Sequence, residues 1–410
     1  MEMLRESASR GSVGGIRNRL RSALVVGEVA VAVLLVAVGS LLTVSFVRLL
    51  RTDPGFEPDR VLASIIIASG DRYSVPARHG ELFQHILDAV RTLPGVQQAG
   101  TVDALPFSGE NHGGFTSSEE SGLLQRGQQL VTELDLVSAE YLQAMGVRLV
   151  EGRWFRDDDA KDSRNVAIVN GAAAQHLFPG ASSLGKRICI NCLAGQPQVW
   201  ARVVGVATSV HHARLEDKDE PEVYLASGAL NAAQFLVVRT AGQGGDLARA
   251  IREKVAAVDP CQPVFLSATM QSLIADSVAD RRFIMTLLGI TGCLALLLSA
   301  AGVYGVVSYA TSRRTKEIGV RMALGASPGS VLTLVFAQGM RLAAVGATIG
   351  LAAAVLSIRV LHSALAGMTG ENPLWMAMAA GLVMAIASLA CSIPARRATR
   401  IEPVAALRED

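Results

Sequence analysis

Four long apolar segments constrain the fold of this chain more than any other feature. They cover 22–47, 283–310, 329–358 and 374–394. A helix needs about 20 consecutive apolar residues to cross a hydrocarbon core, and each segment is long enough. The sequence therefore predicts an α-helical membrane domain of four transmembrane helices.

The rest of the chain is too polar for the membrane. Hydrophobic residues make up 50% of the sequence and charged residues 18%, which excludes an ordinary soluble chain and equally a chain that lies wholly in lipid. Residues 48–282 contain no spanning segment, so we expect a folded domain there on one side of the membrane.

Basic residues in short flanking segments set the orientation, because cytoplasmic loops carry an excess of Lys and Arg. They gather in three places: Arg5, Arg10, Arg17, Arg19 and Arg21; Arg313, Arg314, Lys316 and Arg321; Arg396, Arg397 and Arg400. We therefore expect 1–21, 311–328 and 395–410 in the cytoplasm, and 48–282 with the 359–373 loop outside. The first span is predicted to be a retained anchor, since "SFVRLLRT" follows it instead of a cleavage site.

Two charged residues fall inside the spans. For Arg341, either 328–341 is an interfacial helix, or one long helix carries Arg341 at its cytoplasmic end, where its side chain reaches the headgroups. We favour the second. Glu28 is either an intramembrane contact or coupling residue, or a carboxylate near the cytoplasmic headgroups, and here also we favour the second.

The exterior segment shows one βαβ pattern at each end. "RVLASIII", "ARHGELFQHILDAVRTL" and "GVQQAGTV" read as strand, helix and strand, and "AQFLVVRT", "GDLARAIREKVAAV" and "QPVFLSA" repeat that order. The pattern predicts a split, ferredoxin-like α/β subdomain from 60–106 and 227–268. Between these parts, 107–226 reads as a strand-rich insertion. From 269 a helical pattern runs directly into the second span, so 269–282 is predicted to be a continuous stalk helix.

A charged segment, "SRRTKEIGVRMALGASPGSV", separates the second and third spans. Glu317 and Arg321 form an i,i+4 acid-to-base pair, Val320 and Leu324 share a face, and Gly325 can cap the helix. The orientation rule alone explains the basic residues, but it does not explain the ordered apolar faces. The pattern predicts a short cytoplasmic helix suited to docking on a partner.

Other motifs in the sequence suggest functional sites, but they support them only weakly. "CINC" (Cys189 and Cys192) leaves three interpretations open, namely a structural disulfide that needs a turn at 190–191, unpaired thiols, and redox or zinc chemistry. "GASSLGKR" fits a phosphate loop only in part and follows no buried strand, so we expect no nucleotide there. The acidic run 157–162 reads as a solvated turn and His211 and His212 as ordinary loop residues. No catalytic constellation and no metal site are expected.

At this point the chain resembles the FtsX-like permeases, which include the MacB-type membrane subunits of ABC transporters. "RRTKEIGVRMALGAS" and "PARRATRIEPVAALRED" resemble their cytoplasmic loop and tail, and "VAIVNGAAAQHLFPGASSLGKRI" resembles their periplasmic core. "RNRLRSALVVGEVAVAVLLVAVGSLLTVSFVRLLRTDPGFEPDRVL" resembles the linker and fifth span of the acidobacterial duplicated orphan permeases, in which two such units are fused, so the chain resembles their C-terminal unit. This resemblance implies a periplasmic domain with porter-like and inserted sabre-like subdomains, a dimer of units, and mechanotransmission.

The resemblance also implies partners and site residues. A separate cytosolic ATPase, which binds the ATP and Mg²⁺, would dock on the loop between the second and third spans. The coupling residues would be Glu317, Ile318, Gly319, Arg321, Met322, Leu324 and Gly325. We expect a permease of the bacterial inner membrane with no cofactor of its own. It would pair with itself or with a second unit, and it would work with a periplasmic adaptor or outer-membrane channel in export. The partners would include membrane lipid and no nucleic acid. Alternatives are a scaffold that recruits or activates a cell-wall hydrolase, and a lipoprotein-release permease.

Overall fold

In a computed structural model the chain divides into two units, a helical unit of Met1–Arg48 with Arg281–Asp410 and an α/β unit of Leu49–Asp280. The structure describes residues 2–73, 75, 77–121, 130–161, 166–191, 199–212, 219–226, 233–242, 247–315, 317, 320, 321, 324, 327–364 and 373–398. Each unit has its own apolar core, and each is described separately below.

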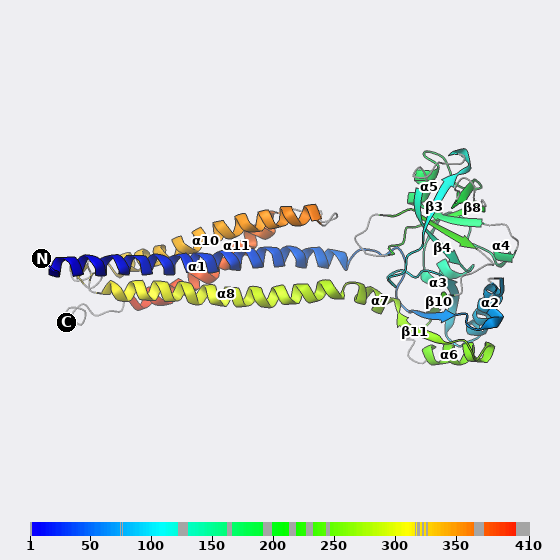
Figure 1. Cartoon of the computed structure of the whole chain (residues 1–410), viewed down its shortest axis with the longest axis horizontal. Helices are drawn as coiled ribbons and strands as arrows, with labels where there is room; N and C mark the ends of the chain where they lie inside the picture. Colours follow the sequence, from blue (N-terminus) through cyan, green and yellow to red (C-terminus); the bar gives the residue numbers. More distant parts are fainter. Residues whose placement is uncertain are drawn as a thin grey trace. The chain divides into compact units, whose positions relative to one another are not determined.

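The helical unit contains four long helices. They are α1 (Glu2–Leu49), α8 (Ala279–Arg313), α10 (Pro328–Ala364) and α11 (Pro373–Ala398) (Figure 1). Each holds one candidate membrane span, over Arg19–Val47, Ala279–Arg313, Gly329–Arg359 and Leu374–Arg397. These spans coincide with the four apolar segments predicted above.

Small residues allow close approach of the helices. On α10, a side chain at Gly346 would meet Val29 and the backbone of Val26, and one at Gly350 would meet the backbone of Ala30. Lipid provides no hydrophobic drive between helices, so tight van der Waals packing of this kind is a main source of their association. The shared core lies between α1, α8, α10 and α11: Val25, Val29, Val33, Val303, Val307, Val335, Ala347, Val383, Cys391 and Ala395.

The α/β unit is built on one sheet of 11 strands. Its strands are β1 (Val61–Ile67), β2 (Val96–Val102), β3 (Gly113–Ser118), β4 (Leu130–Val137), β5 (Leu149–Gly152), β6 (Val166–Asn170), β7 (Arg187–Ile190), β8 (Val199–Ala207), β9 (Glu222–Ala226), β10 (Ala233–Thr240) and β11 (Val264–Thr269). Its α-helices are α2 (Ala77–Arg91), α3 (Tyr141–Met145), α4 (Asp157–Lys161), α5 (Gly171–Leu177), α6 (Leu247–Val258) and α7 (Met270–Ser277). Two 3-10 turns, η1 (Asp71–Tyr73) and η2 (Glu119–Ser121), complete it.

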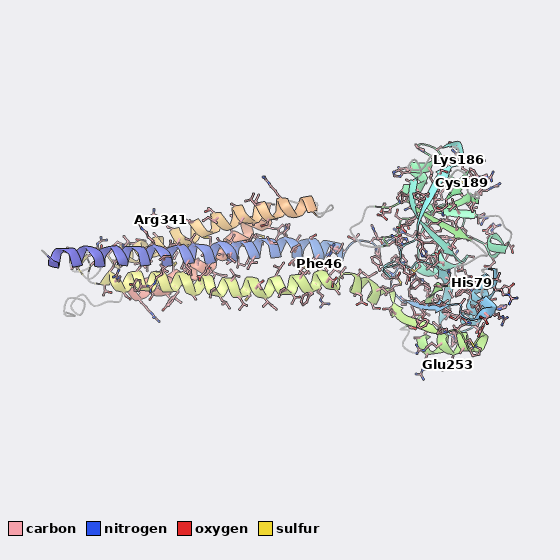
Figure 2. All side chains as sticks on the ribbon, viewed as in Figure 1. Phe46, His79, Lys186, Cys189, Glu253 and Arg341 are labelled. Carbon is pink, nitrogen blue, oxygen red and sulfur yellow. The ribbon has the colours of Figure 1, made fainter. Side chains whose placement is uncertain are left out.

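One end of the sheet has the strand order β11-β1-β10-β2, and all neighbouring strands in it are antiparallel. We call this end, with α2 and α6, the four-strand part. The apolar positions at helical spacing on α2 and α6 are buried against these strands, as periodicity predicted: Leu82, Phe83, Ile86, Leu87, Val90, Ile251 and Val255. Figure 2 marks Glu253 on the exposed side of α6.

The remaining strands, β3 to β9, form the predicted strand-rich insertion. Strand β4 pairs with β3 and β9, and β8 pairs with β5, β6 and β7. Helix α5 packs onto these strands through Ala173 and Leu177. The insertion joins the four-strand part at a single registered pair, Val102 on β2 opposite Val137 on β4.

The helix predicted to run unbroken from 269 into the second span is two helices. Thr269 caps α7 by accepting a hydrogen bond from the Ser272 N–H at 3.2 Å. At Val278 the N–H donates to the carbonyl of Asp276, two residues back, so the regular i to i−4 bonding stops. Helix α8 then begins at Ala279. The prediction of a continuous stalk was therefore wrong at this residue.

Close packing at Gly346 predicts a specific stability effect. We expect Gly346→Ala to lower the stability of the helical unit by about 1–3 kcal/mol, because the added Cβ overpacks the contact with α1. Gly381→Ala on α11 is the matched control, since a Cβ there meets nothing within 4 Å. Both changes bring the same gain in helix propensity. Thermal unfolding in detergent measures the difference, and equal melting temperatures would contradict the packing.

Candidate functional site

The segment between α8 and α10 is helical at Glu317, Val320 and Arg321. The Arg321 guanidinium lies 2.7 Å from the Glu317 carboxylate, and each side chain is about half exposed. An exposed i,i+4 pair of this kind contributes a few tenths of a kcal/mol to a helix. The pair therefore helps order the segment and still leaves both charges accessible.

Apolar side chains on the same segment point away from the protein. Val320 is 44% exposed and Leu324 is 83% exposed, and the Leu324 N–H donates to the Val320 carbonyl at 3.0 Å. Exposed large apolar groups beside an accessible ion pair are typical of a contact surface. The other proposed coupling residues, Ile318, Gly319, Met322 and Gly325, lie outside the described residues.

The two charged residues within the spans have different surroundings. The carboxylate Oε2 of Glu28 is buried without a hydrogen-bond partner and lies against Gly302 of α8, where any side chain would collide with it. Glu28 thus contacts a neighbouring helix. Its depth in a bilayer, on which the two interpretations differ, stays a prediction. Arg341 is exposed on α10, which is one uninterrupted helix (Figure 2). Its depth in a bilayer stays a prediction.

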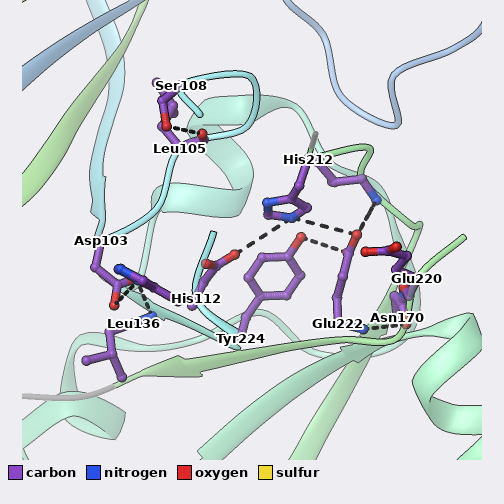
Figure 3. A network of polar contacts seen from close by, with 12 residues as sticks. Asp103, Leu105, Ser108, His112, Leu136, Asn170, His212, Glu220, Glu222 and Tyr224 are labelled. Atoms are coloured by element: carbon purple, nitrogen blue, oxygen red, sulfur yellow. Dashed lines mark hydrogen bonds and ion pairs between the residues drawn. The ribbon is translucent and has the colours of Figure 1, made fainter. Parts of the chain in front are cut away.

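A buried polar cluster in the α/β unit was not predicted (Figure 3). The ring of His212, which follows β8, is directed at two carboxylates, with Nε2 3.8 Å from Asp135 Oδ2 and 3.7 Å from Glu222 Oε1. The Tyr224 hydroxyl donates to Glu222 Oε2 at 2.9 Å. All three ionisable side chains at these contacts are at most 4% exposed.

Neighbouring elements hold the cluster in place. Glu222 accepts hydrogen bonds from the Val210 N–H at 3.1 and 3.3 Å. Asn170 accepts from the N–H groups of Ala173 and Glu222 and donates to Ser209 Oγ and the Glu220 carbonyl. Asn170 therefore ties the end of β6 to both the β8–β9 connection and the start of β9.

A second carboxyl–histidine pair extends the cluster toward β2. Asp103, which follows β2, accepts from the Leu136 N–H at 2.8 Å and lies 3.2 Å from His112 Nδ1. His112 is partly exposed, whereas Asp103 is 3% exposed. The polar contacts thus reach from solvent at His112 to the buried face of β4.

Burial controls the electrostatics of the cluster. Burial, followed by repulsion from neighbouring carboxylates, raises the pKa of Asp135 well above its usual value, and burial also raises the pKa of Glu222. Burial lowers the pKa of His212 to about 4.

One expectation about polar residues was wrong and another was wrong in part. His212 is a buried member of this cluster and not an ordinary loop residue. The acidic run forms the short helix α4 and not a turn, although Asp157 and Asp158 are exposed as expected. Asp159 accepts hydrogen bonds from Arg153 at 2.7 and 3.0 Å, and this ion pair holds the pKa of Asp159 below its usual value. Asp162 lies outside the described residues.

Cys189 lies buried on β7 and is disulfide-bonded (Figure 2). The next residues turn, because Asn191 has a φ of 51° and its N–H donates to the Phe115 carbonyl. Cys192 lies outside the described residues, so the bridge between these two cysteines stays a prediction. Cys261, Cys293 and Cys391 are free.

The glycine-rich motif "GASSLGKR" has its basic residues engaged by carboxylates. Lys186 Nζ lies 2.7 Å from Glu120, and Arg187 lies 3.3 Å from Glu119. Within the described part of the chain, no group of three or more His, Cys, Asp or Glu side chains is arranged to hold a metal ion.

Four candidate membrane helices joined to a large α/β unit define the chain as an integral-membrane subunit with an extramembrane domain. Residues 22–257 match the model of the MacB-like periplasmic core domain, and residues 289–403 match the FtsX-like permease C-terminal model. The chain belongs to the MacB-like and FtsX-like permease family of ABC transporters.

Individual relatives are distant. The chain is 27% identical over 287 residues to a "Macrolide export ATP-binding/permease protein MacB" of Marinobacter nauticus, covering 68% of this chain and 43% of that protein. It is 26% identical over 282 residues to an "Uncharacterized ABC transporter permease YknZ" of Bacillus subtilis, covering 65% and 68%. The periplasmic region of MacB from Actinobacillus actinomycetemcomitans covers 55% of the chain at 13% identity and a TM-score of 0.35. The chain thus spans less than half of the length of several MacB relatives.

The hydrogen bonds of Asn170 predict that replacing this residue lowers the stability of the α/β unit measurably. We expect Asn170→Ala to destabilise the α/β unit by about 3 kcal/mol, because it leaves buried N–H and carbonyl groups without partners. Gln97→Ala, at an exposed amide on β2, is the control and should change stability little. Denaturant unfolding followed by tryptophan fluorescence measures both variants. Equal stability of the two would show that the Asn170 contacts contribute nothing.

Proposed function

We propose that this chain is the permease subunit of an ABC transporter of the bacterial inner membrane and transmits ATP hydrolysis to its α/β unit, in export. The observation that carries the proposal is the ion pair between the helical residues Glu317 and Arg321, with Val320 and Leu324 exposed beside it, between two candidate spans. Relatives named as macrolide and syringafactin exporters support the export direction.

The order of the spans supports this role. One span, α1, precedes the α/β unit, and one span, α8, follows it before Glu317. The α/β unit and the exposed helix then lie on opposite sides of the membrane, with the helix in the cytoplasm. Because α8 leads from one to the other, movement of the helix would be passed along the span.

The partners follow from the same proposal. A separate cytosolic ATPase would bind ATP and Mg²⁺ and dock on the Glu317–Leu324 segment, while this chain holds no cofactor. A second permease unit, either another copy or a related chain, would complete the transporter. Membrane lipid would cover the apolar side chains that the four helices leave exposed, such as Leu287, Leu294 and Leu382.

We also propose that the α/β unit has the family's two subdomains. The strand order β11-β1-β10-β2, with α2 and α6 packed on it, supports a ferredoxin-like porter subdomain. Strands β3 to β9 would be the sabre-like insertion.

The insertion also supports a second role, recruitment of a periplasmic protein. Phe115 on β3 and Val131 on β4 are cross-strand neighbours, 41% and 64% exposed. An exposed apolar pair of this kind favours docking of an adaptor or of a cell-wall hydrolase. A pull-down with the full chain distinguishes these partners, because only a recruiting scaffold would retain a wall hydrolase without any ATPase response.

The coupling role predicts the effect of changes in the exposed helix. We expect Leu324→Ser to weaken the complex with a co-expressed ABC ATPase subunit by about tenfold, because an exposed apolar anchor is lost. Stimulation of ATP hydrolysis should fall in parallel. Copurification and ATPase assays measure both effects, and a variant that binds and stimulates normally would contradict the docking assignment.

A charge exchange separates docking from helix stability. Glu317→Arg combined with Arg321→Glu keeps an ion pair at the same spacing, so the helix should retain its order. If the charges meet a partner, the double variant stays defective in ATPase stimulation. Full recovery by the double variant would mean that the pair acts only within the helix.

A further inference from the structure

The buried polar cluster lies where the two parts of the sheet meet. The registered contact between β2 and β4 is the pair Val102 and Val137. Beside it, the Asp103 N–H donates to the Leu136 carbonyl at 3.3 Å, and its carboxyl accepts from the Leu136 N–H at 2.8 Å. We call this contact the β2–β4 joint. Two further hydrogen bonds belong to it, from the Ser138 N–H to the Thr101 carbonyl at 3.0 Å and from the Thr101 N–H to Ser138 Oγ at 2.8 Å. One of its acceptors, the Asp103 carboxyl, is ionisable, so charge at this carboxyl can affect the joint.

Carboxyl groups dominate the surroundings of the joint. Asp135 on β4 lies opposite Tyr224 of β9, and Glu222 lies opposite Glu133, so the carboxyls are offset along the two strands and both lie near His212. No lysine or arginine of the described residues forms an ion pair with either. The titratable groups around them, taken from every neighbouring element, are Asp103, His112, Glu133, Tyr141, His211, His212, Asp219, Glu220 and Tyr224. Buried carboxylates without a cation nearby are costly in free energy.

His212 lies close to both carboxyl groups. Neither of its ring nitrogens has a hydrogen-bond partner, although its side chain is only 4% exposed and directed at Asp135 and Glu222 (Figure 3). Asp135 Oδ1 also lacks a partner. Two buried carboxyl groups whose oxygens lie within 4 Å of one imidazole nitrogen can hold protons in more than one arrangement.

We propose that Asp135, Glu222 and His212 form a proton-binding site that controls the β2–β4 joint. With protons bound, the carboxyl groups are neutral and the joint is closed. When the site releases a proton to water, a charged Asp135, which precedes Leu136 in β4, repels the Asp103 carboxyl that accepts from the Leu136 N–H, and the joint loosens. Transfer of a proton from a carboxyl to His212 leaves the number of bound protons unchanged.

The sign of the pH dependence follows from the two kinds of group. A carboxyl whose pKa is raised by burial stabilises the fold fully below its ordinary value near 4, and this contribution is lost as the pH rises through the folded pKa. His212, with its pKa lowered to about 4, acts oppositely and costs stability as the pH falls below about 6.5. The carboxyls outnumber the histidine, so the joint should open more at higher pH.

Hydrogen exchange on the full chain in detergent micelles tests this site. Rates for peptides covering β4 and β9 are measured between about pH 5.5 and 8.5 and corrected for intrinsic exchange. The opening equilibrium should rise by up to about tenfold per pH unit for each proton released. Asp135→Asn should reduce this slope by about one proton. Glu253→Gln, at an exposed carboxyl on α6, should keep the wild-type slope.

A conservative variant keeps the test decisive if Asp135→Asn does not fold. Tyr224→Phe removes the hydrogen bond that favours ionised Glu222, so the opening should shift to higher pH. Corrected exchange that does not change with pH would overturn the proposal. So would Zn²⁺ or Ca²⁺ binding that protects β4 and β9 and is lost in Asp135→Asn, because the site would then take a metal cation.

Discussion

The free-energy cost of exposing backbone and polar groups to hydrocarbon is the constraint on which the rest of the structure depends. It requires each long apolar segment to be a helix that satisfies its own hydrogen bonds, and it keeps the α/β unit out of the bilayer. The candidate spans α1 and α8 stand on either side of the α/β unit in sequence. If both helices cross the membrane, as we propose, the segment around Glu317 lies on the side opposite the α/β unit, which is what the proposed coupling to a cytosolic ATPase requires.

The helical unit and the α/β unit are stabilised by different kinds of packing. In lipid, burial of apolar surface provides no drive for helix association, so the helical unit depends on close van der Waals contact between helices. Glycines such as Gly346 and Gly350 allow that close approach. In the α/β unit, α2 and α6 cover the sheet with apolar side chains. The buried polar cluster is the exception to this apolar packing, and it lies beside the single registered pair that joins β2 and β4.

The sequence predicted what depends on local pattern and missed what depends on distant contacts. Apolar length identified the spans, and helical spacing identified the buried faces of α2 and α6. The cluster was missed because Asp103, Asp135, His212 and Glu222 come from four separate segments. One signal was present, since Glu133 and Asp135 alternate with Leu134 and Leu136 on β4. Such alternation is typical of a strand with one solvated polar face, yet here the acids are the more buried set. The break at Val278 was missed because helical periodicity continues across it.

Opposite placement of the α/β unit and the Glu317 segment is the central claim, and thiol labelling tests it most directly. Cys261 is an exposed free thiol of the α/β unit and serves as the internal reporter of its side. The Ser312→Cys variant adds a thiol at the exposed end of α8. With a membrane-impermeant maleimide on intact spheroplasts, the account predicts labelling of Cys261 alone, and labelling of both thiols only after the membrane is opened. Labelling of both thiols in intact spheroplasts would place them on the same side and contradict the account.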